Sequence, residues 1–118
     1  MSFPNQQVCL EACSECVVAC ETCAAACLRE DHVKAMTRCI ELDRTCADLC
    51  ALAVRELARG SNFIDQVCEL CAKVCDACAA ECGKHQHDHC QACAASCLRC
   101  AEACRAMPGK AVLVAGNN

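Results

Sequence analysis

The stretch CLEACSECVVACETCAAAC, residues 9–27, carries a cysteine at every third or fourth position. The steps between these cysteines alternate between four and three residues, which is the a/d spacing of a heptad repeat. On an α-helix this spacing places every cysteine on one stripe, whereas a β-strand, whose side chains alternate from face to face, would scatter them. The stretch therefore predicts a helix with one continuous face of thiols.

The same spacing recurs in two further groups of cysteines, and another group follows it with gaps. The 19 cysteines are Cys9, Cys13, Cys16, Cys20, Cys23, Cys27, Cys39, Cys46, Cys50, Cys68, Cys71, Cys75, Cys78, Cys82, Cys90, Cys93, Cys97, Cys100 and Cys104. In the gapped group, the same steps also pass through His32, Met36 and Asp43. These three side chains are therefore expected to share the stripe with the cysteines.

Four stripes predict four helices, at residues 5–29, 31–59, 62–83 and 88–107. The linkers between them are short, so consecutive helices should run antiparallel. The predicted fold class is all-α, an up-down-up-down antiparallel four-helix bundle with a cysteine-lined core. It forms one domain over residues 1–118, in which residues 108–118 are a C-terminal tail after the last helix.

Local signals at the helix ends agree with this division. Asn62 is a candidate N-cap for the third helix, and Gly83 suits a left-handed C-cap at its end. Asp88 and Gln91 have the spacing of a capping box at the start of the fourth helix.

Composition narrows the possible partners. The chain has 19 cysteines but no tryptophan or tyrosine, so cysteine and alanine must fill much of the core, and the odd number excludes a fully paired set of disulfides. A net charge of −4 gives no basic surface for nucleic acid, and no apolar run is long enough to span a membrane. The first residues, MSFPNQQ, lack a secretory leader, which predicts a cytoplasmic protein with reduced thiols.

Cysteines four positions apart on a helix can converge on one ion, because their Cβ atoms are about 5–6 Å apart and point the same way. The chain contains eight such pairs: Cys9/Cys13, Cys16/Cys20, Cys23/Cys27, Cys46/Cys50, Cys71/Cys75, Cys78/Cys82, Cys93/Cys97 and Cys100/Cys104. Cys39, Cys68 and Cys90 are left over.

Charge and softness favour Cu(I) as the ion. Soft thiolate ligands select Cu(I), and one Cu(I) for each thiolate would leave a filled core near neutrality. Zn(II) at four thiolates per ion would leave a large buried negative charge, and its structural sites usually use knuckles on turns. The expected cofactor is therefore Cu(I), with multiple ions per chain.

Other functions fit less well. A core of inert cysteines is the usual explanation of a single buried thiol, but it does not account for 19 in heptad register. Iron–sulfur loop motifs and a nucleophile–base pair are absent from the sequence, so we expect no enzyme. A metallothionein-like buffer for zinc or cadmium, or a detoxification protein, remains the alternative.

Nitrogen, thioether and carboxylate side chains collect at one end of the predicted bundle. The linkers after the first and third helices lie at that end and bring together Asp31, His32, Met36, His85, His87 and His89. We expect some of these side chains to be metal ligands that bind copper at this end of the bundle and pass it inward. His32 and Met36 are the better candidates because they lie on the stripe, whereas each of the other three histidines is more simply a polar residue of a loop.

Asp43 is the least expected residue of the stripe. It is either a boundary residue paired with Arg38 or Arg44, or an oxygen ligand or hydrogen-bond acceptor beside Cys39. The sequence leaves both possibilities open.

The repeated C-x-x-x-C-x-x-C stripe over four helices, with His and Met near one end, closely resembles the bacterial copper storage proteins. The resemblance covers residues 5–107. It implies a four-helix bundle that assembles as a homotetramer and holds many Cu(I) ions in each subunit through the cysteines of the stripe. The missing leader and the high cysteine content are similar to the cytosolic branch of that family. The second helix departs from a full cysteine ladder around Asp43.

Overall fold

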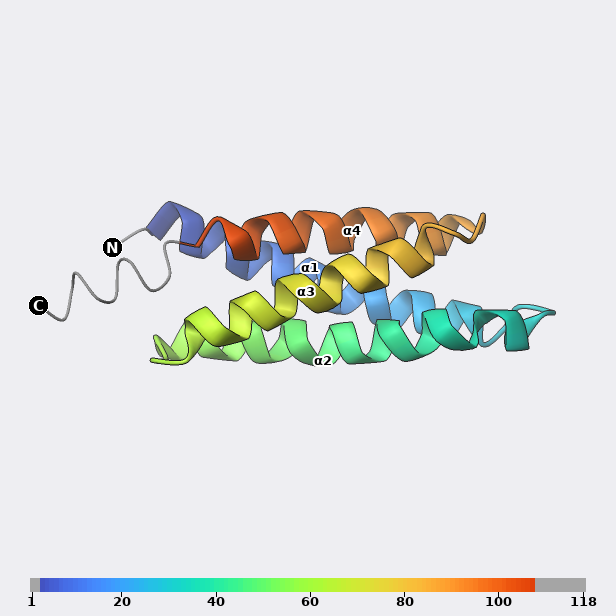
Figure 1. Cartoon of the computed structure of the whole chain (residues 1–118), viewed down its shortest axis with the longest axis horizontal. Coiled ribbons are helices and arrows are strands. Elements are labelled where there is room, and N and C mark those ends of the chain that lie inside the picture. Colours follow the sequence, from blue (N-terminus) through green and yellow to red (C-terminus); the bar gives the residue numbers. More distant parts are fainter. Residues whose placement is uncertain (1–2, 108–118) are drawn as a thin grey trace, which may run out of the picture.

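The computed structural model describes residues 3–107, with side chains described from residue 5 onward. Four α-helices make up most of this part of the chain: α1 (Phe3–Cys27), α2 (Thr37–Arg59), α3 (Ile64–Cys82) and α4 (Asp88–Arg105). A short 3₁₀ turn, η1 (Val33–Met36), precedes α2. The molecule is a rod of 57 × 17 × 17 Å (Figure 1).

The helices form a square ring around a common axis. Each helix packs against two neighbours, in the pairs α1–α2, α2–α3, α3–α4 and α1–α4. Consecutive helices run in opposite directions, so the connections after α1 and after α3 lie at the same end of the rod, opposite the connection between α2 and α3 (Figure 1). The predicted up-down-up-down bundle is confirmed.

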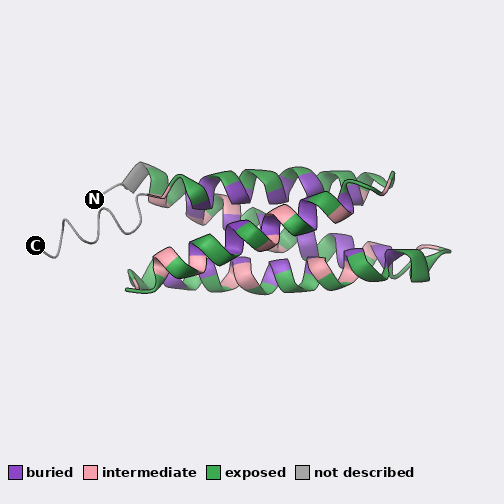
Figure 2. Ribbon diagram, in the orientation of Figure 1, coloured by how far each residue is buried: buried purple, intermediate pink, exposed green. Residues whose placement is uncertain are grey.

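All 19 cysteines are buried, and none of them is more than 4% exposed. The buried residues follow the inward faces of the four helices, as Figure 2 shows. Small neighbours such as Ala24, Ala47 and Ala101, each no more than 3% exposed, allow the helices to approach closely. Among the described residues, the side chains that are less than 2% exposed belong to cysteine, alanine and Asp43, so the prediction of a core built mainly from sulfur is also confirmed.

The prediction of a continuous second helix over residues 31–59 is wrong at its beginning. The chain leaves α1 through the backbone bonds Arg29 N–H to Ala26 O and Glu30 N–H to Cys27 O, which are the tighter three-residue type that ends a helix. His32 has φ −105° and ψ 56°, outside the helical region. The stripe of α2 therefore starts after this turn, and His32 does not lie on it.

The predicted cap at the start of α3 is also wrong. Phe63 occupies the N-cap position in place of Asn62, and its N–H donates to Ser61 Oγ at 3.0 Å. A hydroxyl one residue before the expected cap thus satisfies a backbone donor of the turn.

Gly83 and Gln91 act differently from their predicted roles. Gly83 has φ −62° and continues the right-handed conformation, whereas the left-handed C-cap of the fold is Gly60, with φ 65°. The amide of Gln91 donates to the carbonyl oxygens of Gly83 and His85, so it ties down the loop before α4 instead of forming a capping box with Asp88.

The end of the bundle away from the histidines is closed by apolar side chains. Leu57 is 4% exposed, and Ile64 and Met107 pack partly buried against the core. None of the helices in residues 3–107 is both long and apolar enough to cross a membrane. The predicted tail, residues 108–118, lies outside the described residues.

Candidate metal centre

The cysteine pairs along each helix are close enough to share an ion. In seven of the eight predicted pairs the two Sγ atoms are 3.8–4.0 Å apart: Cys9–Cys13, Cys16–Cys20, Cys23–Cys27, Cys46–Cys50, Cys71–Cys75, Cys78–Cys82 and Cys93–Cys97. The members of the eighth pair, Cys100 and Cys104, lie 3.5 and 3.8 Å from Cys13. The spacing inferred from one helix at a time therefore holds in three dimensions.

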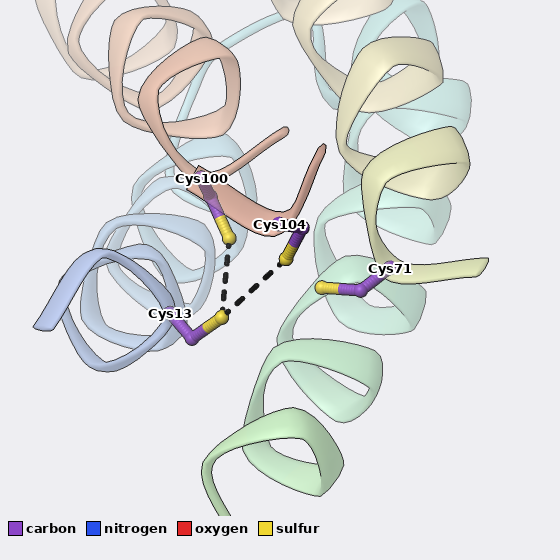
Figure 3. A group of neighbouring side chains, drawn as sticks. All are labelled: Cys13, Cys71, Cys100 and Cys104. Carbon is purple, nitrogen blue, oxygen red and sulfur yellow. Dashed lines mark hydrogen bonds between the residues drawn. The ribbon is translucent and has the colours of Figure 1, made fainter. Parts of the chain in front are cut away.

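Thiols on different helices lie equally close to one another. Cys13 of α1, Cys71 of α3 and the pair Cys100 and Cys104 of α4 point toward a common centre (Figure 3). Further groups of four, with all Sγ atoms within 4.8 Å of one another, are Cys16/Cys46/Cys50/Cys75, Cys16/Cys20/Cys46/Cys97, Cys20/Cys78/Cys93/Cys97 and Cys23/Cys27/Cys39/Cys90. Each of these groups draws on three helices.

The groups share members, which makes them one network. Cys16, Cys20, Cys46 and Cys97 each belong to two of the groups. A thiolate that belongs to two groups can bridge two ions, so the arrangement suits linked clusters better than isolated sites. The sequence could not show this, because the groups depend on how the helices are aligned lengthwise.

Sulfur spacing alone does not select the metal. A separation of about 3.8 Å is the edge of a tetrahedron with the roughly 2.3 Å bonds of zinc thiolate sites, so single groups could also accept Zn(II). The composition of the core is more selective. Apart from cysteine, the buried polar or charged residues among those described are Asp43, Glu56 and Ser96, with no cationic side chain among them. The positive charge that neutralises the thiolates must therefore come from the bound ions.

Burial favours the protonated form of two thiols at the histidine end of the metal-free core. It raises the pKa of Cys90 to about 11, and it also raises the pKa of Cys27. Hydrogen bonds from Cys23 and Cys82 act in the opposite direction on Cys39 and lower its pKa. Since a metal binds the thiolate, each protonated thiol must release its proton as an ion enters.

Asp43 lies in the middle of the thiol network and is fully buried. Its Oδ1 atom accepts hydrogen bonds from the thiols of Cys78 and Cys82 at 3.2 Å and of Cys93 at 3.3 Å. Cys39 donates to Oδ2 at 3.8 Å. Burial is the main cause that raises the pKa of Asp43 to about 10, so its carboxyl group is neutral at pH 7.

These contacts decide between the two interpretations of Asp43. Arg38 and Arg44 pair instead with the exposed carboxylates of Glu41, at 3.9 Å, and Glu21, at 3.2 Å. Asp43 is therefore an acceptor beside Cys39, as one interpretation held. Its three other thiol partners come from α3 and α4 and were not foreseen.

His89 is the histidine that meets the thiols. Its Nδ1 atom lies 3.5 Å from the sulfurs of Cys23 and Cys90 and 3.9 Å from that of Cys27. Its Nε2 atom lies 2.9 Å from Glu30 Oε2. The imidazole thus closes the end of the network with one nitrogen facing the core and the other facing the surface.

The other candidates at this end do not reach the sulfur network in the same way. His32 and Asp31 are exposed, whereas Met36 is buried at 3% exposure. His85 Nε2 lies 3.1 Å from Glu81 Oε2, and the ring of His87 stacks on that of His89 with centroids 5.3 Å apart. The sequence favoured His32 over the loop histidines because it assumed an unbroken helix, and the turn over residues 28–36 reverses that order.

Known proteins are similar to this chain in sequence and architecture. The sequence profile of the copper storage proteins matches residues 3–109. The uncharacterised cysteine-rich protein YhjQ of Bacillus subtilis (strain 168) is 52% identical over 101 residues, which cover 86% of this chain and 94% of the relative.

Solved structures agree in both sequence and shape. The Cu(I)-bound copper storage protein BsCsp3 is 51% identical with a TM-score of 0.84, covering 87% of this chain and 97% of that one. A cytosolic copper storage protein from Streptomyces lividans, solved during copper loading, is 40% identical with a TM-score of 0.84, covering 86% and 90%. Together with the thiol-lined bundle, these matches show that the chain belongs to the copper storage protein family.

Proposed function

We propose that this protein stores Cu(I) in the cytosol, with many ions bound by the cysteine thiolates inside the bundle. The observation that carries the proposal is the network of four-thiol groups, which share members and contain no buried cationic side chain in the part of the chain that the structure describes. The Bacillus and Streptomyces relatives, which are Cu(I)-bound and cytosolic respectively, support it.

The charge of the core favours Cu(I) over a divalent ion. Each thiolate that loses its proton adds one negative charge to a medium in which unpaired charge is expensive. One Cu(I) for each thiolate restores neutrality, and bridging sulfurs make that ratio possible with two sulfurs around each ion. Zn(II) at four thiolates per ion would leave two uncompensated charges at each site, which is the weakness of the zinc or cadmium buffer as an alternative.

Two side chains other than cysteine complete the proposed ligand set. Asp43 Oδ1, which accepts hydrogen bonds from the thiols of Cys78, Cys82 and Cys93, is proposed to bind ions held by these cysteines. At the end of the bundle, His89 Nδ1 joins Cys23, Cys27 and Cys90 as the first site that an incoming ion meets. We assign the protein no catalytic role, because thiolates saturated with Cu(I) are poor nucleophiles.

The protein is also proposed to assemble as a homotetramer, as its resemblance to the family implies. Apolar side chains on the outside of the rod, such as Val18, Leu28 and Leu98, each at least 56% exposed, are available to a second copy. Light scattering that gave the 12.5 kDa mass of a single chain would contradict the assembly.

The choice of metal can be tested by competition. When the Cu(I)-loaded protein is incubated without oxygen in an excess of Zn(II), we expect it to retain its copper, because exchange would leave the core negatively charged. The measurement is the metal content of the desalted protein by mass spectrometry. Replacement of most of the copper by zinc would favour the buffer.

The first site can be tested with two histidine variants. We expect His89→Ala to slow the uptake of the first Cu(I) equivalents but to leave the final capacity nearly unchanged, because most of the thiols lie deeper. His32→Ala is the matched control at the same end, and we expect the wild-type rate, since His32 is exposed and outside the thiol stripe. Stopped-flow measurement of the thiolate-to-Cu(I) charge-transfer absorbance gives the uptake rates of both variants. Equal rates for the two variants would remove His89 from its proposed role.

A further inference from the structure

The imidazole ring of His89 lies between sulfur atoms on one side and a carboxylate on the other. Nδ1 faces Cys23 and Cys90 at 3.5 Å, while Nε2 faces Glu30 Oε2 at 2.9 Å. A neutral imidazole carries one N–H and one lone pair, and only the nitrogen with the lone pair can bind a metal. The tautomer of His89 therefore decides whether copper can use it.

The carboxylate of Glu30 can select the tautomer of His89. The Glu30 side chain is 30% exposed, and a carboxyl group in contact with solvent is ionised at neutral pH, so it can only accept hydrogen bonds. A proton on Nε2 satisfies it, whereas a proton on Nδ1 would leave two lone pairs facing each other across 2.9 Å. Metal-binding histidines usually donate their second N–H to a carboxylate or carbonyl group in this manner.

Two features hold the carboxylate and the ring in place. The Glu30 N–H donates to Cys27 O at 3.2 Å, which ties the backbone of Glu30 to the residue that supplies one of the three sulfurs. On the other side, the ring of His87 stacks on His89 at an interplanar angle of 3°, and its Nδ1 lies 3.6 Å from the same Glu30 oxygen. Glu30 is 30% exposed, so an ion from solvent can approach this end.

We propose that Glu30 is a positioning residue for copper uptake: its carboxylate holds His89 as the Nε2–H tautomer and so directs the Nδ1 lone pair at the sulfurs of Cys23, Cys27 and Cys90. In the metal-free protein, a thiol of this group keeps its proton and donates it as a hydrogen bond to Nδ1. When Cu(I) arrives, it takes the place of that proton between nitrogen and sulfur, and the proton leaves to solvent. The proposal rests on the proposed function of His89 and adds a residue that does not touch the ion.

The tautomer can be measured without copper. We expect the ¹⁵N NMR signals of His89 in the reduced, metal-free protein at neutral pH to show a protonated Nε2 and an unprotonated Nδ1. A His89 ring protonated at Nδ1 would overturn the proposal. Because this experiment contains no metal, its result is independent of whether the protein stores copper.

The effect on uptake is separated from simple electrostatic attraction by a double-mutant cycle. We expect Glu30→Ala to slow the uptake of the first Cu(I) equivalent by about 10- to 100-fold. Loss of the carboxylate behind a metal-binding histidine usually lowers metal affinity or activity by that factor. Glu30→Gln, which removes the same charge but keeps an oxygen acceptor, should retain more of the rate. In a His89→Ala background, Glu30→Ala should have no further effect, since its only route of action is gone.

Glu81→Ala is the matched control. Glu81 lies at the same end and pairs with His85 and Lys84, so the variant removes an equal charge without touching His89. We expect it to load at the wild-type rate. Equal slowing by Glu81→Ala, or undiminished slowing by Glu30→Ala when His89 is absent, would show a general charge effect and overturn the proposal. Failure of the wild-type protein to take up more than two ions would instead contradict storage.

Discussion

Filling the core with Cu(I) is expected to raise the free energy of unfolding by about as much as the whole stability of a typical domain. The metal-free core is held by small side chains, cysteine and alanine, and contains a fully buried carboxyl group. Each ion that binds the native state adds about 2.7 kcal/mol when free Cu(I) is one hundred times its dissociation constant. Four such ions would add about 11 kcal/mol, within the usual 5–15 kcal/mol of a folded domain.

The structure gives a reason why the gain should be large. Each of the four-thiol groups described above joins three helices, so one cluster of bound ions resists the separation of all three. Cysteines of the unfolded chain also bind Cu(I), which reduces the gain below this sum. The measurement is guanidinium unfolding of metal-free and loaded protein under reducing, anaerobic conditions. Removal of the copper with a strong chelator should restore the lower midpoint, and equal midpoints would contradict the account.

The second large effect concerns Asp43 in the metal-free protein. Its pKa is about 10 in the folded state and 3.8 when unperturbed, so the native state keeps a proton that the unfolded chain releases above about pH 4. The contribution of this carboxyl group to the free energy of unfolding is therefore complete below pH 4 and is lost progressively as the pH rises toward 10. From pH 4 to pH 7 the loss amounts to about 4 kcal/mol.

Asp43→Asn should remove this pH dependence, because the amide has the same shape and does not titrate. We expect the wild-type protein to lose about 4 kcal/mol more stability than the variant between pH 4 and pH 7. Asp48→Asn, which changes an exposed carboxylate on the same helix, should keep the wild-type slope. Denaturant unfolding at several pH values in this window gives the three slopes. Parallel curves for wild type and Asp43→Asn would show that Asp43 is ionised in the folded protein.

The heptad register predicted the larger features of the fold. Steps of three and four residues define a helical stripe without reference to any other part of the chain, and 19 cysteines leave few other residues for the core. The predictions that were wrong concerned the ends of single helices, and the contacts that were not predicted involve several helices. The ends of helices at His32 and Gly83 depend on backbone angles that many residues can adopt, so a single glycine or asparagine is a weak signal.

The ligand sets could be predicted only within a helix. The sequence placed Asp43 beside Cys39, four residues away, but its bonds to Cys78, Cys82 and Cys93 depend on how α2, α3 and α4 are aligned. The contacts of His89 could not be predicted for the same reason. It lies next to Cys90 in the sequence, yet its contacts with α1 and with Glu30 appear only when the two connections at that end meet.

The central claim is that the whole thiol network, and not one site, binds Cu(I). The most direct test is an anaerobic titration of the reduced, metal-free protein with Cu(I) in the presence of a strong competing chelator. With one ion for each thiolate, we expect the protein to withhold copper from the chelator through many equivalents, toward a number comparable to its 19 cysteines. Saturation after one or two equivalents would contradict it.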